Sequence, residues 1–302
     1  MRVGQSESRS IRELCLLLGY SRQAYYQYHK QSEKEALQYD LLIQEVLEIR
    51  TLQKRIGTRK LFHMTIDFRK LHGIVIGRDA FFDLLSFSGL LIRKRRRKKP
   101  LTTYSNHWLR KHPNLIIGFI PLGPNLLWVS DITYIDLDEG HAYLSLITDA
   151  YSRKIVGFYL SEELTAEGCI EALKMAFKNN PERIKLIHHS DRGVQYCSGK
   201  YVALLNKNTV DISMTQSGDP KENAIAERVN GILKEELLEG SYPNFKEAQK
   251  AIAKAVSIYN HHRPHGSIDM LTPAEAHQGE GELKKRWKNY YSINKRKEIN
   301  MG

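Results

Sequence analysis

A run of ten residues at positions 126–135 reads LLWVSDITYI and decides the fold class of the chain. It is rich in the β-branched and aromatic residues that favour strands, and it holds a single carboxylate, Asp131. An isolated Asp inside an apolar strand is costly unless it is paired or bound to a cation. The run therefore predicts a buried strand that carries an acid with a special role.

Further strands and helices are expected after this run, each bounded by turn residues. They lie at 142–147 (strand), 154–160 (strand), 165–178 (helix), 184–189 (strand), 199–206 (helix) and 210–214 (strand). Three consecutive strands followed by alternating helices and strands predict an α/β domain with a mixed sheet.

A second acid, Asp191, lies at the carboxyl end of the strand that finishes with His188, His189 and Ser190. Ligand sites of α/β sheets collect at such strand ends. We weigh two interpretations of the histidines, as metal ligands or as packing residues, and a carboxylate site favours packing. Asp149, at the end of the second strand, is a candidate for a further acid near the site.

A third acid comes from a helix that we expect to begin at Asp219 and Pro220. Asp219 is placed to act as the N-cap, with Glu222 completing a capping box. The apolar residues further along recur with helical spacing and form one face. The opposite face holds Asn223, Glu227, Asn230 and Lys234. Glu227 is therefore expected to point into a polar cleft.

Three carboxylates suit a hard divalent cation, Mg²⁺ or Mn²⁺, because these ions prefer oxygen ligands. Two such ions about 3.5–4 Å apart activate an attacking oxygen and stabilise the leaving oxygen of an in-line phosphoryl displacement. Asp131, Asp191 and Glu227 are our candidates for both catalysis and metal binding.

The net charge of the 302-residue chain is +12, which indicates a polyanionic partner. The charge is unevenly spread: +13 over residues 1–120, −7 over 121–282 and +6 over 283–302. No apolar run is long enough for a membrane span, and three cysteines without CxxC spacing argue against a disulfide framework. We expect an intracellular protein whose basic ends bind nucleic acid around an acidic centre.

The N-terminal part predicts helices in a helix-turn-helix arrangement. Residues 11–18, a turn at Gly19 and an N-cap at Ser21 place Arg22 and Gln23 in the first turn of the second helix, where such motifs read bases. A plain helical hairpin is the alternative. A helix over 35–52 and a second helical unit over 58–87, with turns at Gly73 and Gly89, are expected next.

Seven consecutive cations follow this helical part and are closed by Pro100. They are Arg93, Lys94, Arg95, Arg96, Arg97, Lys98 and Lys99. Mutual repulsion prevents such a run from folding on itself, so we interpret it as an arm along DNA, or as a solvated linker.

Three motifs together identify a family resemblance: WVSDITY at 128–134, HSDRGVQY at 189–196 and NAIAE at 223–227. Asp131 and Asp191 are separated by 59 residues, and Asp191 and Glu227 by 35. Lys234 follows the glutamate by seven positions, and YNHHRPHGS occupies 259–267. The chain resembles the DDE transposases of bacterial insertion sequences, in particular the integrase-core (OrfB) product of the two-reading-frame group.

The resemblance implies an RNase H-like fold and a Mg²⁺-dependent transposase, in which Asp131, Asp191 and Glu227 form the metal-binding triad. It implies DNA contacts by Lys234, and we add Asn223 and Arg192 from the matching motifs. Hydrolysis at the terminal inverted repeats and then transesterification by the 3′-OH are the expected steps. A homo-oligomer on DNA, an upstream-frame (OrfA) partner and a cytoplasmic, nucleoid-associated location follow as expectations. A catalytically silent DNA-binding repressor and a nuclease of RNA–DNA hybrids are the rival functions.

Five segments are predicted from these features. They are a helix-turn-helix segment (1–55), a second helical DNA-binding module (56–92), a basic linker (93–120), the RNase H-like catalytic core (121–280) and a basic C-terminal tail (281–302).

Overall fold

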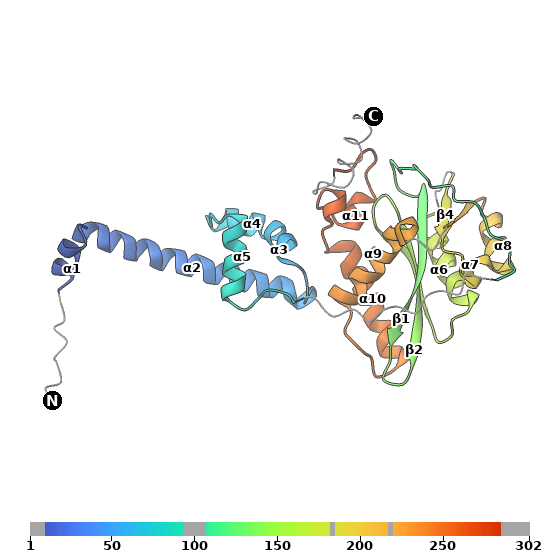
Figure 1. Ribbon diagram of the computed structural model, residues 1–302, viewed down its shortest axis with the longest axis horizontal. Helices are drawn as coiled ribbons and strands as arrows, with labels where there is room; N and C mark the ends of the chain where they lie inside the picture. The colour runs from blue at the N-terminus through green and yellow to red at the C-terminus, as the bar shows by residue number, and fades with distance from the viewer. Residues whose placement is uncertain (1–9, 94–106, 182–184, 217–219, 285–302) are drawn as a thin grey trace, which may run out of the picture. The chain divides into compact units, whose positions relative to one another are not determined.

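The computed structural model describes residues 10–93, 107–181, 185–216 and 220–284. The chain divides into two compact units (Figure 1). One unit comprises Met1–Thr51 and Gly57–Leu91, and the other comprises Leu52–Ile56 and Ile92–Gly302. The finer boundaries expected from the sequence stay predictions.

The first unit is helical. Its elements are α1 (Ile11–Leu17), α2 (Arg22–Leu52), α3 (Thr58–Met64), α4 (Ile66–Leu71) and α5 (Arg78–Phe87). The expected turn is present, with Gly19 at a φ of +74°, and the Ser21 hydroxyl accepts a hydrogen bond from the Ala24 amide (3.0 Å). The helix expected to start anew near residue 35 is instead the continuation of α2, because no Gly or Pro interrupts residues 22–52. Within the described ranges, no helix has the length and apolar character that a membrane span requires.

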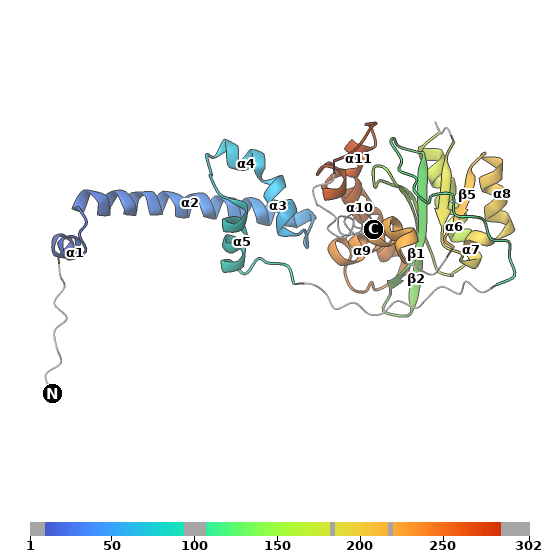
Figure 2. The same ribbon diagram turned by 45° about the horizontal axis from the view of Figure 1, so that its top comes forward.

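The second unit is built on a mixed β-sheet packed between helices (Figures 1 and 2). The sheet has five strands in the order β3-β2-β1-β4-β5. The strands are β1 (Leu127–Asp136), β2 (His141–Asp149), β3 (Ile155–Ser161), β4 (Ile187–Ser190) and β5 (Asp211–Met214). β1, β2 and β3 pair antiparallel, whereas β1, β4 and β5 pair parallel. This arrangement confirms the mixed-sheet, RNase H-like α/β fold expected from the sequence.

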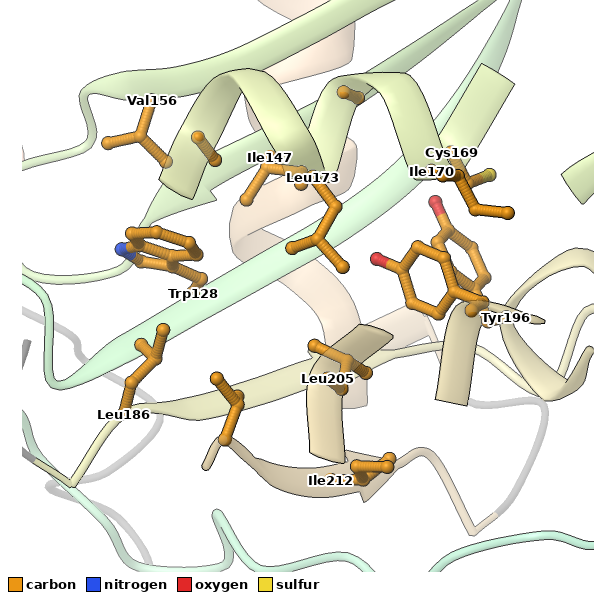
Figure 3. Close-up of a cluster of buried hydrophobic side chains, with 14 of the residues drawn as sticks. Trp128, Ile147, Val156, Cys169, Ile170, Leu173, Leu186, Tyr196, Leu205 and Ile212 are labelled. Carbon is orange, nitrogen blue, oxygen red and sulfur yellow. The ribbon is translucent and has the colours of Figure 1, made fainter. Parts of the chain in front are cut away.

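Helices cover both faces of the sheet. They are α6 (Ala166–Asn179), α7 (Val194–Cys197), α8 (Gly199–Lys207), α9 (Ala224–Ile232), α10 (Phe245–His261) and α11 (Pro273–Ala276), with short turns η1 (Pro220–Asn223), η2 (Leu233–Leu237, π-helical) and η3 (Gly266–Ile268). One apolar cluster joins the sheet to α6, α7 and α8 and contains Trp128, Leu173 and Tyr196 (Figure 3). A second cluster joins the sheet to α9 and α10.

A close approach of α6 to β3 requires a glycine. A Cβ built on Gly157 would lie 2.2 Å from the Ala172 carbonyl oxygen, closer than any side chain allows. This close contact and the packing of the buried Leu173 hold α6 against the sheet. The candidate site is built on the strands of that sheet.

Residues 107–126, here called the strap, run without helix or strand beside the outer strand β5. The Met214 amide donates to the Pro113 carbonyl (3.2 Å), and the Leu115 amide donates to the Ser213 hydroxyl (2.9 Å). The strap begins at His107, whose Nε2 donates to the Arg192 carbonyl (2.7 Å). It therefore satisfies one backbone amide of an edge strand and connects that edge to the loop after β4.

Candidate active site

The parallel pairing of β1 and β4 brings two of the predicted acids together. Trp128 lies opposite His188 and Val129 opposite His189. The same register, continued by two positions, sets Asp131 beside Asp191 on strands about 4.8 Å apart. Because β4 ends at Ser190, Asp191 lies at the carboxyl end of its strand, where α/β sheets place their ligand sites.

Asp131 is half-buried and held by two donors. Its Oδ1 accepts from the Ile132 amide (2.9 Å), and its Oδ2 accepts from Asn230 Nδ2 (2.8 Å). Burial and the negative charges of Asp191 and Glu227 raise the pKa of Asp131 to about 7, although the hydrogen bonds from Asn230 and the Ile132 amide act in the opposite direction. The three predicted acids therefore act on one another electrostatically, and ionised Asp131 is in an environment that favours a nearby cation.

Glu227 comes from α9, which begins later than the sequence predicts. Pro220–Asn223 forms a 3-10 turn, and the α-helix starts at Ala224. The Asn223 side chain makes no cap contact, since its Nδ2 donates to the Ser130 carbonyl (2.9 Å). Glu222 accepts from the Gln216 amide, and Asp219, the expected N-cap, lies outside the described residues.

The polar face of α9 divides into two roles. Glu227 is exposed, whereas Asn223 and Asn230 are each 6% exposed and pack toward β1. Asn223 supports the β1 backbone through its hydrogen bond to Ser130, and its expected contact with DNA stays a prediction. The support that Asn230 gives Asp131 was not predicted, although its position three residues after Glu227 on the same polar face is a signal that could have indicated it.

The loop after β4 orients Asp191. Asp191 Oδ1 accepts from the Gly193 amide (3.0 Å). A Cβ built on Gly193 would lie 3.0 Å from the same Oδ1, so the lack of a side chain permits this turn. The intervening Arg192 is half-buried, and its carbonyl accepts from His107 of the strap.

The two histidines beside Asp191 are packing residues. His188 Nε2 lies 2.6 Å from the Ser130 hydroxyl and 2.9 Å from the Tyr201 hydroxyl. His189 Nδ1 lies 2.8 Å from the Ser213 hydroxyl. Burial lowers the pKa of His188 to about 3 and that of His189 to about 4, so both are neutral near pH 7. These contacts support the packing interpretation over the metal-ligand one.

Asp149 lies away from the predicted triad. The β1–β2 register pairs it with Trp128, three positions and about 10 Å along the strand from Asp131. Its Oδ2 accepts from the Asn125 amide (2.8 Å), and its Oδ1 accepts from the amide and the hydroxyl of Ser152 (both 2.7 Å). Asp149 therefore organises a turn of the fold.

The candidate DNA contacts lie in several parts of the chain. Lys234 is exposed in η2; partial burial lowers its pKa, and the nearby Asp136 acts in the opposite direction. Arg22 and Gln23 are exposed in the first turn of α2, as predicted. Arg93 is exposed, and its carbonyl accepts from Arg55 Nη2 (2.7 Å). Lys94, Arg95, Arg96, Arg97, Lys98 and Lys99 lie outside the described residues.

The three acids offer only carboxylate oxygens, which are the donors that Mg²⁺ and Mn²⁺ prefer. In the part of the chain that the structure describes, no three His, Cys, Asp or Glu side chains converge closely enough to hold an ion. The negative charges of Asp191 and Glu227 nevertheless both raise the pKa of Asp131, so the three acids influence one another at this spacing. A divalent cation would relieve this repulsion, so the residue types and charges fit such an ion.

Comparisons with known proteins show what the chain is similar to. Family models of the integrase core domain match residues 121–220 and 208–273. The insertion element IS600 uncharacterized 31 kDa protein of Shigella sonnei is 36% identical over 267 residues, covering 86% of this chain and 96% of that protein. Transposase InsF for insertion sequence IS3fB of Escherichia coli (strain K12) is 34% identical over 194 residues, covering 63% of this chain and 67% of that protein. The HTLV-2 integrase catalytic core domain, solved with magnesium, aligns at 19% identity and a TM-score of 0.43, covering 52% of this chain and 99% of that one.

Proposed function

The chain belongs to the integrase-core transposases of insertion sequences, and on this basis we propose that it cleaves and joins DNA strands at the terminal inverted repeats of its own element. The proposal is supported by the register of β1 and β4, which leads toward Asp131 and Asp191, and by the negative charges of Asp191 and Glu227, which both raise the pKa of Asp131. Three mutually repelling carboxylates are costly for a fold, and a site for divalent cations accounts for that cost.

Asp131, Asp191 and Glu227 would hold Mg²⁺ or Mn²⁺, with two ions per site. When bound, such ions lower the pKa of the attacking water or hydroxyl and offset the charge on the leaving oxygen. The protein's own contribution is orientation: Asn230 and the Ile132 amide fix Asp131, and the Gly193 amide fixes Asp191.

The reaction has two phosphoryl transfers. In the first, water attacks a phosphodiester at the end of the element, and the P–O3′ bond breaks to leave a 3′-hydroxyl. In the second, this hydroxyl attacks a phosphodiester of another strand, a new P–O bond forms and the displaced strand leaves with its own 3′-hydroxyl. No covalent bond to the enzyme is required in either step.

The basic segments supply the affinity for DNA. Residues 1–120 carry 23 Lys and Arg against 10 Asp and Glu, and residues 283–302 carry seven against one. Neutralising phosphates with these side chains makes binding weaken steeply with salt. Our candidate contacts among the described residues are Arg22, Gln23, Arg93, Arg192, Asn223 and Lys234. A homo-oligomer on DNA, an upstream-frame partner and a cytoplasmic location belong to the same proposal.

The test is a strand-cleavage and joining assay with purified protein, Mg²⁺ and a duplex that carries a terminal repeat. We expect cleaved and joined products from the unchanged chain and none from Asp131→Asn or Glu227→Gln. Asp211→Asn is a matched control, because Asp211 is an exposed acid at the start of β5. Full activity of the Asp131 and Glu227 variants would contradict the proposal. Gel shifts with DNA but no strand products from the unchanged chain would favour the repressor.

A further inference from the structure

Trp108 is an exposed tryptophan in the strap, beside the loop that carries Asp191. Its side chain is 92% exposed, whereas Trp128, the other tryptophan among the described residues, is fully buried. Tryptophan is ordinarily well buried, because its large apolar surface is costly to leave in water. An exposed indole at this position therefore requires an explanation.

The residues on both sides of Trp108 are fixed. His107 donates to the Arg192 carbonyl (2.7 Å), which belongs to the residue directly after Asp191. Leu109 is partly buried against the apolar cluster under α6, α7 and α8. Further along, the strap is hydrogen-bonded to β5 through Pro113. The backbone that carries the indole is thus held in place, which lowers the entropic cost of binding a ligand there.

The surroundings of Trp108 are basic. Arg110 and Lys111 follow it directly on the strap and are exposed. The positive charges of Lys111 and Arg192 both act on the pKa of Cys197, opposing the increase that burial causes, so both cations lie near α7. An exposed aromatic ring flanked by cations is the combination that binds single-stranded nucleic acid, by base stacking and phosphate contacts.

We propose that Trp108 is a stacking platform for an unpaired DNA base beside the catalytic loop, with Arg110 and Lys111 binding the adjacent phosphates. The inference rests on the proposed function, which supplies DNA as the substrate. Bases inside a duplex are covered on both faces by their neighbours, so the indole selects a base at a frayed or single-stranded end. Such a base holds the strand end next to Asp191.

The test measures DNA binding by the full chain without divalent ions, so that no cleavage occurs. Two labelled duplexes of the same sequence are compared by anisotropy, one blunt and one with a short unpaired end. Trp108→Ala is expected to weaken binding of the unpaired end roughly ten-fold and to leave the blunt duplex unchanged. Trp108→Phe, which keeps an aromatic face, retains most of the preference. Ile120→Ala is the control, since Ile120 is exposed on the same strap but has no ring.

Fluorescence gives a second readout in a Trp287→Phe background, where Trp108 and the buried Trp128 are the tryptophans that remain. The unpaired end is expected to quench the emission, and Trp108→Phe to abolish that quenching. The inference would be overturned if Trp108→Ala weakened binding of both duplexes equally or of neither. It would also be overturned by an emission shift that depends on protein concentration in the absence of DNA. The last result would mean that a second copy covers the indole.

The experiment separates this inference from the proposed function. The Asp131→Asn, Glu227→Gln double variant is expected to keep the preference for unpaired ends while losing strand cleavage. A chain with this preference that never cuts DNA would contradict the proposed function alone. A chain that cuts terminal-repeat DNA without the preference would contradict the stacking platform alone.

Discussion

Asp131 and Asp149 lie on adjacent strands of one sheet, and their surroundings are opposite. Asp149 is fully buried and accepts three hydrogen bonds, one from Asn125 and two from Ser152. Asp131 accepts two, from Ile132 and Asn230, and it also faces the charges of two other carboxylates. Hydrogen-bond donors of the protein therefore satisfy Asp149, whereas Asp131 lacks, among the described residues, a positive charge that would offset the two neighbouring carboxylates.

This difference distinguishes an acid that stabilises the fold from an acid that is available for chemistry. A carboxylate surrounded by donors stabilises the turn that supplies them. A carboxylate placed among like charges destabilises the fold unless a ligand compensates, and such local conflicts are expected at functional sites.

Asp131→Asn should lower strand cleavage and joining roughly 10³-fold or more, since it removes a charge on which the divalent ions depend. The measurement is the rate of product formation with a terminal-repeat duplex at saturating Mg²⁺. The variant should remain folded by circular dichroism, so that lost activity reports on the site. A rate within a few-fold of that of the unchanged chain would show that Asp131, like Asp149, serves the fold and not catalysis.

Asp149→Ala should act on stability, because it leaves the Asn125 amide and both Ser152 donors without their acceptor. We expect a loss of roughly 3–5 kcal/mol from the stability of the second unit. The thermal midpoint of that unit reports the loss, with Asp211→Ala as the control for an exposed acid. An unchanged midpoint would show that these hydrogen bonds contribute nothing to the fold.

The pH dependence of stability should differ between Asp131→Asn and the unchanged chain. The pKa of Asp131 is raised in the folded state from its ordinary value of 3.8 to about 7. Between these values the unfolded chain releases a proton that the folded chain keeps, so stability falls as the pH rises through this window. Asn does not titrate, and the variant should be more stable by up to a few kcal/mol near pH 8.

The same comparison near pH 4 supplies its control. There, Asp131 is mostly protonated in the folded state, and the advantage of the variant over the unchanged chain should shrink toward zero. Denaturant melts of both proteins across the window test this. A constant stability difference from pH 4 to 8 would contradict the raised pKa of Asp131.

Asn230→Ala should have a smaller effect, because it removes one hydrogen bond to Asp131 and no ligand. We expect a loss of roughly 10- to 100-fold in activity. Since this hydrogen bond lowers the pKa of Asp131, its loss should move the acidic limb of the rate profile to higher pH. Asn208→Ala is the matched control, because Asn208 follows α8 directly and its Nδ2 donates to the Leu204 carbonyl (2.9 Å), away from the three acids. A uniform loss of rate with no shift of the acidic limb would mean that Asn230 acts on folding alone.

Much of the fold and of the candidate site could be predicted from local patterns. The apolar run at 126–135 predicted β1, and the residues around His188 and His189 predicted the strand that Asp191 follows. The hydrogen bond from Asn230 to Asp131 was not predicted, because the two residues lie 99 positions apart and are brought together by the fold. The start of α9 was misplaced for the same reason, since Asn223 bonds to Ser130, 93 residues earlier.

The role of Asp131 in a cation site is tested most directly by titration calorimetry of Mg²⁺ binding near pH 8, on the unchanged chain and on Asp131→Asn. We expect the unchanged chain to bind Mg²⁺. Asp131→Asn should bind it at least roughly 100-fold more weakly or not at all, because the variant lacks one ligand and its charge. Equal Mg²⁺ affinity in the two proteins would contradict the claim that Asp131 is the acid kept for a cation.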